Sequence, residues 1–158
     1  TEISADVNVK SLLSNILMAM NAEISMKSPE IELSLPENLT ISSKTGPLQQ
    51  IFEQLISNSL IHGFENEQNN QIKIGAESKG NNLEITYVDN GIGVPNSIKK
   101  RIFDPFVTTK RGEGGSGLGM HLVYNLVTQA LDGSITLDED YSDGTRIIIS
   151  LPLGELTS

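Results

Sequence analysis

The chain has 158 residues, of which 37% are hydrophobic and 20% are charged, and this composition predicts one folded domain over residues 1–158 rather than a disordered segment. It contains no cysteine, which excludes disulfide bonds and thiolate metal sites and favours a cytoplasmic location. The net charge of −9 and the lack of a long apolar run argue against binding to nucleic acid and against direct membrane contact.

The first third of the sequence predicts a helix followed by two strands. Apolar residues at three- and four-residue intervals indicate an amphipathic helix over residues 7–26, which Pro29 ends. Alternating apolar residues then predict strands at 31–35 and 39–42. Because only a short turn containing Pro36 separates these strands, we expect them to pair as a hairpin.

The middle of the chain predicts a second helix and another hairpin. Gly46-Pro47 is typical of a helix start, and the apolar stripe that follows continues to Gly63. Residues 72–76 and 83–88 alternate as strands, and the polar turn between them indicates that they pair.

The last third begins with a glycine-rich stretch, residues 89–119, which contains a short helical candidate at 97–102. A long irregular segment of this kind is typical of a functional loop. A third helix follows it, and residues 134–137 and 145–151 predict a closing hairpin. The residues expected on the inward side of the third helix are Leu118, Leu122, Val123, Leu126, Val127 and Ala130.

This order of elements predicts a two-layer α/β (α+β) sandwich. The strands do not alternate one by one with helices, which argues against a doubly wound parallel sheet. We expect a mixed, mostly antiparallel sheet of about five or more strands, covered on one face by the three helices.

The first candidate site lies on the second helix, where Gln54 and Asn58 are four residues apart. Both amides therefore project from one face, while Leu55, Ile56 and Leu60 face the core. A plain solvated polar face explains this pattern at least as well, so the pair alone does not identify a site.

The second candidate site is the run from Asp89 through Gly91 to Gly93, directly after a predicted strand. Glycines at such a place let the backbone approach a flat ligand closely, and the carboxylate can accept hydrogen bonds there. An ordinary turn containing Asn-Gly is the alternative.

The third candidate site is the aromatic pair Phe103 and Phe106, followed by Thr108, Lys110 and Arg111. The rings would pack the loop onto the body of the domain. The two cations are either a solvated pair or ligands for phosphate, since a glycine run follows them directly.

The fourth candidate site is the glycine run from Gly112 to Gly119, which opens the third helix. Backbone N–H groups at a helix start can cradle an anion, and a flexible linker fits less well because an apolar helix follows at once. Gly112, Gly114 and Gly117 also match a dinucleotide fingerprint, with Asp138 about twenty residues further on, but no buried strand leads into the first glycine. A P-loop is excluded because no Lys-Ser or Lys-Thr follows the last glycine.

Together these patches resemble the GHKL superfamily of ATPases and kinases, and specifically the catalytic ATP-binding domain of sensor histidine kinases. The helix with Asn58 resembles the family's N box, residues 89–93 its first glycine box, 103–106 its F box and 115–119 its second glycine box. Thr145 lies in a segment similar to the family's closing Gly-Thr strand. The boxes come in the family's order along nearly the whole chain, and the resemblance implies a Bergerat-type ATP-binding fold.

The resemblance also implies a role for each matching residue. Asn58 would coordinate a Mg²⁺ ion that bridges the phosphates of ATP, and Asp89 would accept a hydrogen bond from the adenine amino group, which favours ATP over GTP. Residues 104–117 would form a mobile lid over the nucleotide. The implied catalytic residues are Gln54, Asn58, Lys110 and Arg111, and the implied ATP-binding residues are Asn58, His62, Asp89, Gly91, Gly93, Ile98, Phe103, Phe106, Thr108, Lys110, Gly115, Ser116, Gly117, Leu118, Gly119, Met120 and Thr145.

Two positions on the second helix bear on the reaction. Hydrolysing relatives carry a glutamate four residues before the metal asparagine, where this chain has Gln54 with Glu53 beside it. An amide does not take a proton from water, so the resemblance implies phosphoryl transfer rather than hydrolysis. Many histidine kinases also place a lysine where this chain has Ile61. The candidates for replacing that cation are His62, Lys110 and Arg111.

Neither His62 nor His121 lies in the sequence context of a phosphoacceptor helix. The resemblance therefore implies that the acceptor is a histidine on a dimerising helical hairpin absent from this chain. The phosphoryl group would then pass to the receiver domain of a response regulator. The alternatives are an ATP hydrolase of the same fold and a non-enzymatic nucleotide-sensing module.

Overall fold

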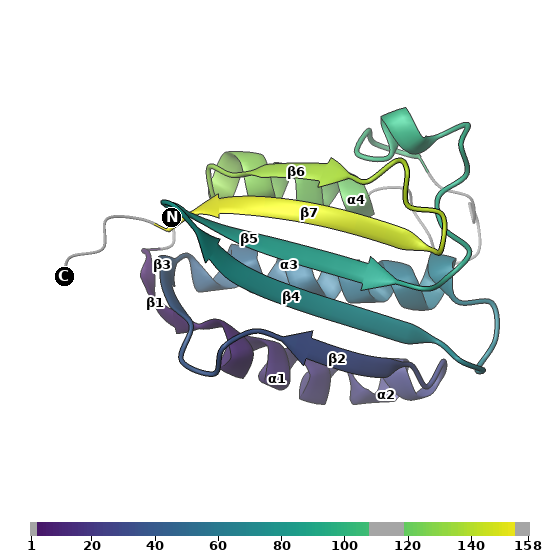
Figure 1. The fold of residues 1–158 in the computed structure, drawn as a ribbon, viewed down its shortest axis with the longest axis horizontal. Coiled ribbons are helices and arrows are strands. Elements are labelled where there is room, and N and C mark those ends of the chain that lie inside the picture. The colour runs from purple at the N-terminus through teal and green to yellow at the C-terminus, as the bar shows by residue number, and fades with distance from the viewer. Residues whose placement is uncertain (1–2, 108–118, 154–158) are drawn as a thin grey trace.

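The computed structural model describes residues 3–107 and 119–153, and Figure 1 shows helices lying across one face of a sheet. The strands of this sheet, in spatial order, are β2 (Glu30–Ser34), β4 (Gln71–Lys79), β5 (Asn82–Asp89), β7 (Thr145–Pro152) and β6 (Ser134–Leu137). The main helices are α1 (Val9–Ala19), α3 (Thr45–Asn58) and α4 (Gly119–Asn125). The predicted two-layer α/β fold is confirmed. In this part of the chain, no helix combines the length and hydropathy that crossing a bilayer requires.

The sheet is mixed and mostly antiparallel, as predicted. Strand β2 runs parallel to β4, whereas β5 pairs antiparallel with β4 and β7, and β6 pairs antiparallel with β7. The register places Asp89 at the end of β5 opposite Thr145 at the start of β7. Figure 1 shows these two strand ends and the C-terminal end of α3 on the same side of the molecule. The second candidate site therefore lies beside the first.

Apolar side chains between the sheet and the helices form the core. Strand β5 buries every second residue, as expected for a strand with one face against helices. Helix α3 buries a stripe at three- and four-residue intervals. The largest fully buried side chains are Tyr87, Phe52, Phe64, Leu13, Leu48, Ile51, Leu55, Ile56, Ile72, Ile74, Leu83 and Ile85.

The predicted helix over residues 7–26 is shorter than expected. Residues Ala5–Asn8 instead form strand β1, which pairs with β3 (Thr40–Ser43) in a separate two-stranded sheet. Helix α1 ends at Ala19, and a short helix α2 (Asn21–Ser25) follows it. The apolar periodicity located the helix but not its first residue.

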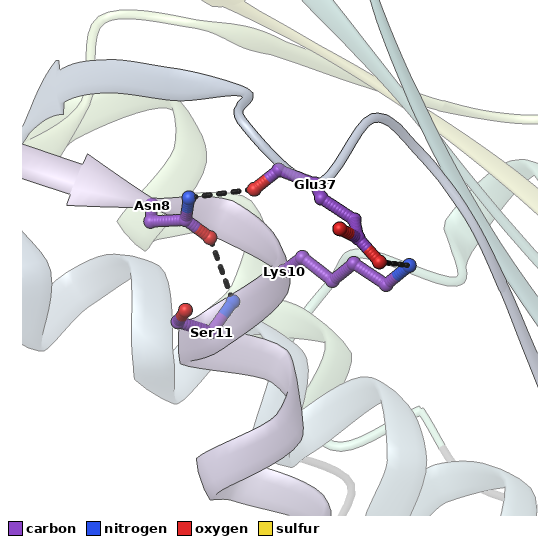
Figure 2. A network of polar contacts seen from close by, with 4 residues as sticks. All are labelled: Asn8, Lys10, Ser11 and Glu37. Atoms are coloured by element: carbon purple, nitrogen blue, oxygen red, sulfur yellow. Dashed lines mark hydrogen bonds and ion pairs between the residues drawn. The ribbon is translucent and has the colours of Figure 1, made fainter.

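The start of α1 is set by Asn8, as Figure 2 shows. The Asn8 side chain accepts a hydrogen bond from the backbone N–H of Ser11 at 2.9 Å and donates one to the backbone oxygen of Glu37 at 2.8 Å. Lys10 adds an ion pair to the Glu37 carboxylate at 3.9 Å. An N-cap residue has non-helical backbone angles, so the helix begins at Val9 and not at Val7 as predicted.

The predicted hairpin between residues 31–35 and 39–42 is wrong, although both strands exist. Strand β2 joins the large sheet beside β4, and β3 pairs with β1. In the β1–β3 pair Ile41 lies opposite Val7, and both side chains are buried. Alternation of apolar residues indicates a strand but does not indicate its partner.

The third helix exists, but one of its expected inward residues faces outward. Val123 and Val127, four residues apart, are fully buried, whereas Leu122 is 38% exposed. Leu122 lies about 100° around the helix from Val123, which turns it away from the core. The helix ends in a π-helical turn, η3 (Leu126–Ala130). Leu118 lies outside the described residues.

Candidate functional site

A cavity of about 320 Å³ opens where α3, β5, β7 and α4 meet, and this volume is within the range of small-molecule sites. Its walls come from α3, from the π-helical turn η1 (Ser59–Gly63) that continues α3, from the facing ends of β5 and β7, from residues 93–102 and from the start of α4. Single π-helical turns within helices are frequent at functional sites.

Asp89 is the buried charged group of this cavity and is 4% exposed. Its Oδ1 accepts hydrogen bonds from the backbone N–H groups of Gly91 at 3.0 Å and Thr145 at 3.2 Å. Its Oδ2 accepts a hydrogen bond from Ser59 Oγ at 2.6 Å. A carboxylate offers about four lone-pair positions. Among the described residues, hydrogen bonds fill both positions of Oδ1 and one of Oδ2, which leaves one acceptor position for a ligand.

Ser59 connects this carboxylate to Tyr87, whose hydroxyl lies 2.7 Å from Ser59 Oγ. Because Ser59 directs its only proton to Asp89, Tyr87 must donate its own proton to Ser59. Burial raises the pKa of Tyr87 well above its ordinary value, and the charge of Asp89 adds to this rise. The phenol therefore stays protonated at neutral pH and acts as a donor.

Two glycines allow the chain to close around this carboxylate. A Cβ atom at Gly91 would lie 2.4 Å from the backbone oxygen of Gly63, and a Cβ atom at Gly144 would lie 2.0 Å from the backbone oxygen of Asp89. Gly144 also has a φ of 143°, which residues with side chains rarely adopt. A side chain at either position would push the β5 end away from η1 or from β7.

Gln54 and Asn58 converge on the start of α4. A Cβ atom at Gly119 would lie 3.1 Å from Asn58 Oδ1 and 3.1 Å from Gln54 Oε1. Amide oxygens suit hard cations, and the N–H groups of a helix start suit anions. Within residues 3–107 and 119–153, no group of three or more histidine, cysteine or acidic side chains is placed to hold a metal ion.

Residues 94–102 close the cavity with apolar side chains. Val94, Pro95, Ile98 and Ile102 line this side, and the short helical candidate at 97–102 contains a 3₁₀ turn at Lys99–Arg101. An apolar wall facing a buried carboxylate suits a flat ring that carries a hydrogen-bond donor.

The cavity brings together residues from three of the four predicted patches. The predicted site residues that line it are Gln54, Asn58, His62, Asp89, Gly93, Ile98, Gly119, Met120 and Thr145. Gly91 does not line the cavity, but its backbone N–H donates a hydrogen bond to the Asp89 carboxylate. The predicted residues outside the described part are Thr108, Lys110, Arg111, Gly115, Ser116, Gly117 and Leu118, together with most of the predicted lid at 104–117.

The two aromatic residues of the third patch do not line the cavity, and their contact with ATP stays a prediction. Phe103 stacks on Tyr124 with the ring centroids 5.8 Å apart, and its backbone oxygen lies 2.9 Å from His121 Nδ1. Phe106 is 61% exposed and has a φ of 67°. Phe103 therefore packs its loop onto α4, as predicted.

Ser59 and Tyr87 line the cavity and bond to each other beside Asp89, and the sequence analysis predicted neither of them as a site residue. Tyr87 precedes Asp89 by two residues on a strand, so both side chains point to the same face of the sheet. Ser59 directly follows Asn58. Their positions close to Asp89 and Asn58 in the sequence were the signals that could have identified them.

The family model described as "Histidine kinase-, DNA gyrase B-, and HSP90-like ATPase" matches residues 43–155, which include every wall of the cavity. The chain belongs to this family of ATP-binding domains. Its relatives narrow the class to the catalytic domain of sensor histidine kinases, and the resemblance seen in the sequence is confirmed.

The alginate biosynthesis sensor protein KinB of Pseudomonas aeruginosa is 34% identical over 106 residues, which cover 67% of this chain and 17% of KinB. The signal transduction histidine-protein kinase BaeS of Escherichia coli (strain K12) is 28% identical over 153 residues, which cover 94% of this chain and 32% of BaeS. The chain thus spans a third or less of the length of these curated relatives.

Solved histidine kinase structures share the fold. The nucleotide-free catalytic domain of histidine kinase ThkA matches with a TM-score of 0.81 at 22% identity, covering 95% of both chains. ThkA in complex with response regulator protein TrrA matches with a TM-score of 0.77 at 20% identity, covering 95% of this chain and 42% of that one.

Proposed function

We propose that this domain binds Mg-ATP in the cavity and transfers the γ-phosphoryl group to a histidine on a separate helical hairpin of the same sensor kinase. One observation carries the proposal. A buried carboxylate with one open acceptor position and two amide oxygens beside a helix start line a single cavity. One end of this cavity suits a base and the other suits a phosphate chain.

The base end favours adenine. The open position on Asp89 Oδ2 can accept a hydrogen bond from the 6-amino group of adenine, whereas the 6-oxo group of guanine would meet the carboxylate with like partial charge. Gly93 and Thr145 line the same wall, and the apolar side chains at 94–102 would cover the ring. We therefore expect ATP to bind more tightly than GTP.

The phosphate end has the chemistry that a magnesium ion requires. Asn58 would supply one amide oxygen, while phosphate oxygens and water supply the rest, which is how Mg²⁺ is commonly bound beside nucleotides. The ion would neutralise charge on the phosphates when bound. His62 lines the cavity nearby, and Lys110, Arg111 and the glycine run would complete this end as part of the lid at 104–117.

The amide side chain of Gln54, four residues before Asn58, favours phosphoryl transfer over hydrolysis of ATP. Gln54 lines the cavity, whereas Glu53 does not, and an amide cannot act as the general base that activates water. Rapid release of phosphate from ATP by this domain alone, without an acceptor, would contradict the proposal and favour an ATP hydrolase.

The acceptor and the downstream partner are expected to lie outside this chain. His121 contacts the Phe103 backbone oxygen through Nδ1 and lies 3.3 Å from Asn125 Nδ2 through Nε2, which supports a structural role. A response regulator receiver domain is the expected final recipient, by analogy with the ThkA–TrrA complex.

The test combines binding and transfer. The native domain and Asp89→Asn would be titrated with ATP and GTP, with and without magnesium, and then mixed with labelled ATP and the separately produced acceptor hairpin of the parent kinase. The expected result is preference for ATP, a magnesium requirement for labelling of the hairpin, and loss of the ATP preference in Asp89→Asn. Equal affinity for both nucleotides, or a hairpin that stays unlabelled, would contradict the proposal.

A further inference from the structure

Two buried hydroxyl groups, bonded to each other, lie beside the carboxylate of the cavity. Tyr87 and Ser59 are each 1% exposed and Asp89 is 4% exposed. Tyr87 and Asp89 come from β5 and Ser59 comes from η1, so this hydroxyl chain joins a strand to the helix that carries Asn58. All three residues line the cavity. The roles implied by the family resemblance include neither Tyr87 nor Ser59.

We propose that Ser59 and Tyr87 are positioning residues that set the base selectivity of the site by holding Asp89 with a single acceptor position turned toward the base. The inference rests on the proposed function, because it takes adenine as the group that Asp89 recognises. It goes further because it assigns the discrimination between a 6-amino and a 6-oxo purine to two residues that act through Asp89.

The direction of the hydroxyl chain is fixed. A phenol buried among apolar side chains keeps its proton, so Tyr87 acts as a donor. Its bond at 2.7 Å fills an acceptor position of Ser59 Oγ, and the Ser59 proton goes to Asp89 Oδ2 at 2.6 Å. A serine hydroxyl has one proton and rotates freely in isolation. Tyr87 therefore keeps Ser59 from turning its proton elsewhere.

The hydroxyl chain also fixes the orientation of the carboxylate. The bonds from Gly91 and Thr145 both end on Oδ1, so Ser59 supplies the bond that holds Oδ2. Without it, Oδ2 would have two open positions and would recruit a water molecule. Water both donates and accepts hydrogen bonds, so it can bridge to a 6-oxo group as well as to a 6-amino group. Selectivity should fall even though the carboxylate is still present.

The experiment compares Mg-ATP with Mg-inosine triphosphate, which carries a 6-oxo group in place of the 6-amino group. Both would be titrated calorimetrically into the native domain, Ser59→Ala, Tyr87→Phe and Ser59→Thr. The matched control is Tyr141→Phe, which removes a tyrosine hydroxyl that lies outside the cavity wall. Thermal melting of each variant checks that it is folded.

The expected result is a loss of ATP affinity of about fivefold to tenfold in Ser59→Ala and Tyr87→Phe, the net size of one ordinary hydrogen bond. Inosine triphosphate should lose no more than about twofold, because it does not use the open position of Asp89. Ser59→Thr keeps the hydroxyl and should restore most of the preference for ATP. Tyr141→Phe should behave as the native domain.

The outcomes separate this inference from the proposed function. An unchanged ratio of the two affinities in both variants would overturn the inference, and so would an equal loss for both nucleotides, since a merely structural role predicts that. If Ser59→Ala does not fold, Tyr87→Phe decides, because it keeps the ring that fills the core. A native domain with no preference for ATP would overturn the proposed function and the inference together. A native preference that survives in the variants would overturn the inference alone.

Discussion

The two ends of the cavity are built in different ways. At the base end Asp89, Ser59 and Tyr87 are buried and bonded to one another and to the backbone of neighbouring elements. At the phosphate end Gln54, Asn58 and Gly119 are only partly buried, and the side-chain amide oxygens of Gln54 and Asn58 both lie close to Gly119.

This difference indicates a division of labour. Buried polar groups that satisfy one another are rigid, so the base end can select a ligand by the direction of its hydrogen bonds. Partly exposed groups around a helix start can admit a cation and phosphates, which bring their own charge and water. Substitutions at the base end should therefore change the nucleotide selectivity or the stability of the fold. Substitutions at the phosphate end should change the rate of phosphoryl transfer or of ATP hydrolysis.

The largest effect is expected at Asn58. Asn58→Ala removes the expected metal ligand at the phosphate end, so phosphoryl transfer to the acceptor hairpin should fall by about 100-fold or more, while the melting temperature changes little. Gln50→Ala removes an exposed amide from the same helix and should leave transfer intact. Radiolabelling of the hairpin measures both. Normal transfer in Asn58→Ala would remove the distinction between the two ends.

The next effect tests the rigidity of the base end. Gly144→Ala places a Cβ atom 2.0 Å from the Asp89 backbone oxygen at a φ of 143°, and it should reduce the free energy of unfolding by about 2–4 kcal/mol. The control, Gly80→Ala, also has a positive φ of 62° but meets no atom within 4 Å, so it should cost about 1 kcal/mol. Urea unfolding measures both values. Equal losses would mean that backbone conformation alone, and not the closure around Asp89, matters.

A smaller effect is expected when the phosphate end is given a general base. Gln54→Glu places a carboxylate on the cavity wall beside Asn58, and basal ATP hydrolysis should rise by about tenfold, the lower end of what a positioned base contributes. Release of inorganic phosphate in the absence of acceptor measures this change. Glu53→Gln is the control, since Glu53 does not line the cavity. A fall in hydrolysis in Glu53→Gln would show instead that the neighbouring carboxylate acts on water.

The smallest effect is expected at an ion pair just outside the base end. Arg146 donates a hydrogen bond to Asp138 at 2.8 Å, and this bond lowers the pKa of Asp138. A lowered pKa means that the fold favours the ionised form, so its contribution is present above about pH 4 and is lost as the pH falls through the lowered value. Asp138→Asn should melt slightly below the native domain at pH 7 and together with it at about pH 2. A large difference at pH 7 would mean that the base end depends on this surface pair.

The sequence predicted most of the fold because its signals were local. Helix α3, strands β4 and β5, and the closing hairpin each followed from periodicity and from turn residues such as Pro47. The failures were non-local. Nothing in residues 31–42 says that β3 pairs with the N-terminal strand, because that choice depends on Val7 meeting Ile41 and on Asn8 bonding the Glu37 backbone.

In the candidate site too, residues with a local sequence pattern were predicted and residues that depend on non-local contacts were not. Asp89, Asn58 and Gly119 were predictable because each belongs to a motif with its own local pattern, although their meeting in one cavity required the fold. Ser59 and Tyr87 were missed because a serine in a helix and a tyrosine in a strand are ordinary residues there. Their function depends on two elements meeting, which periodicity does not report.

The claim that a purine base occupies one end of the cavity and its phosphates the other can be tested directly by titrating the ¹⁵N-labelled domain with adenosine and then with Mg-ATP. Adenosine should shift the backbone amide signals of Gly91 and Thr145 while Gly119 and the Asn58 side-chain amide stay near their free positions. Mg-ATP should shift all four. An adenosine titration that leaves Gly91 and Thr145 unmoved, or a Mg-ATP titration whose shifts lie away from this cavity, would contradict the account.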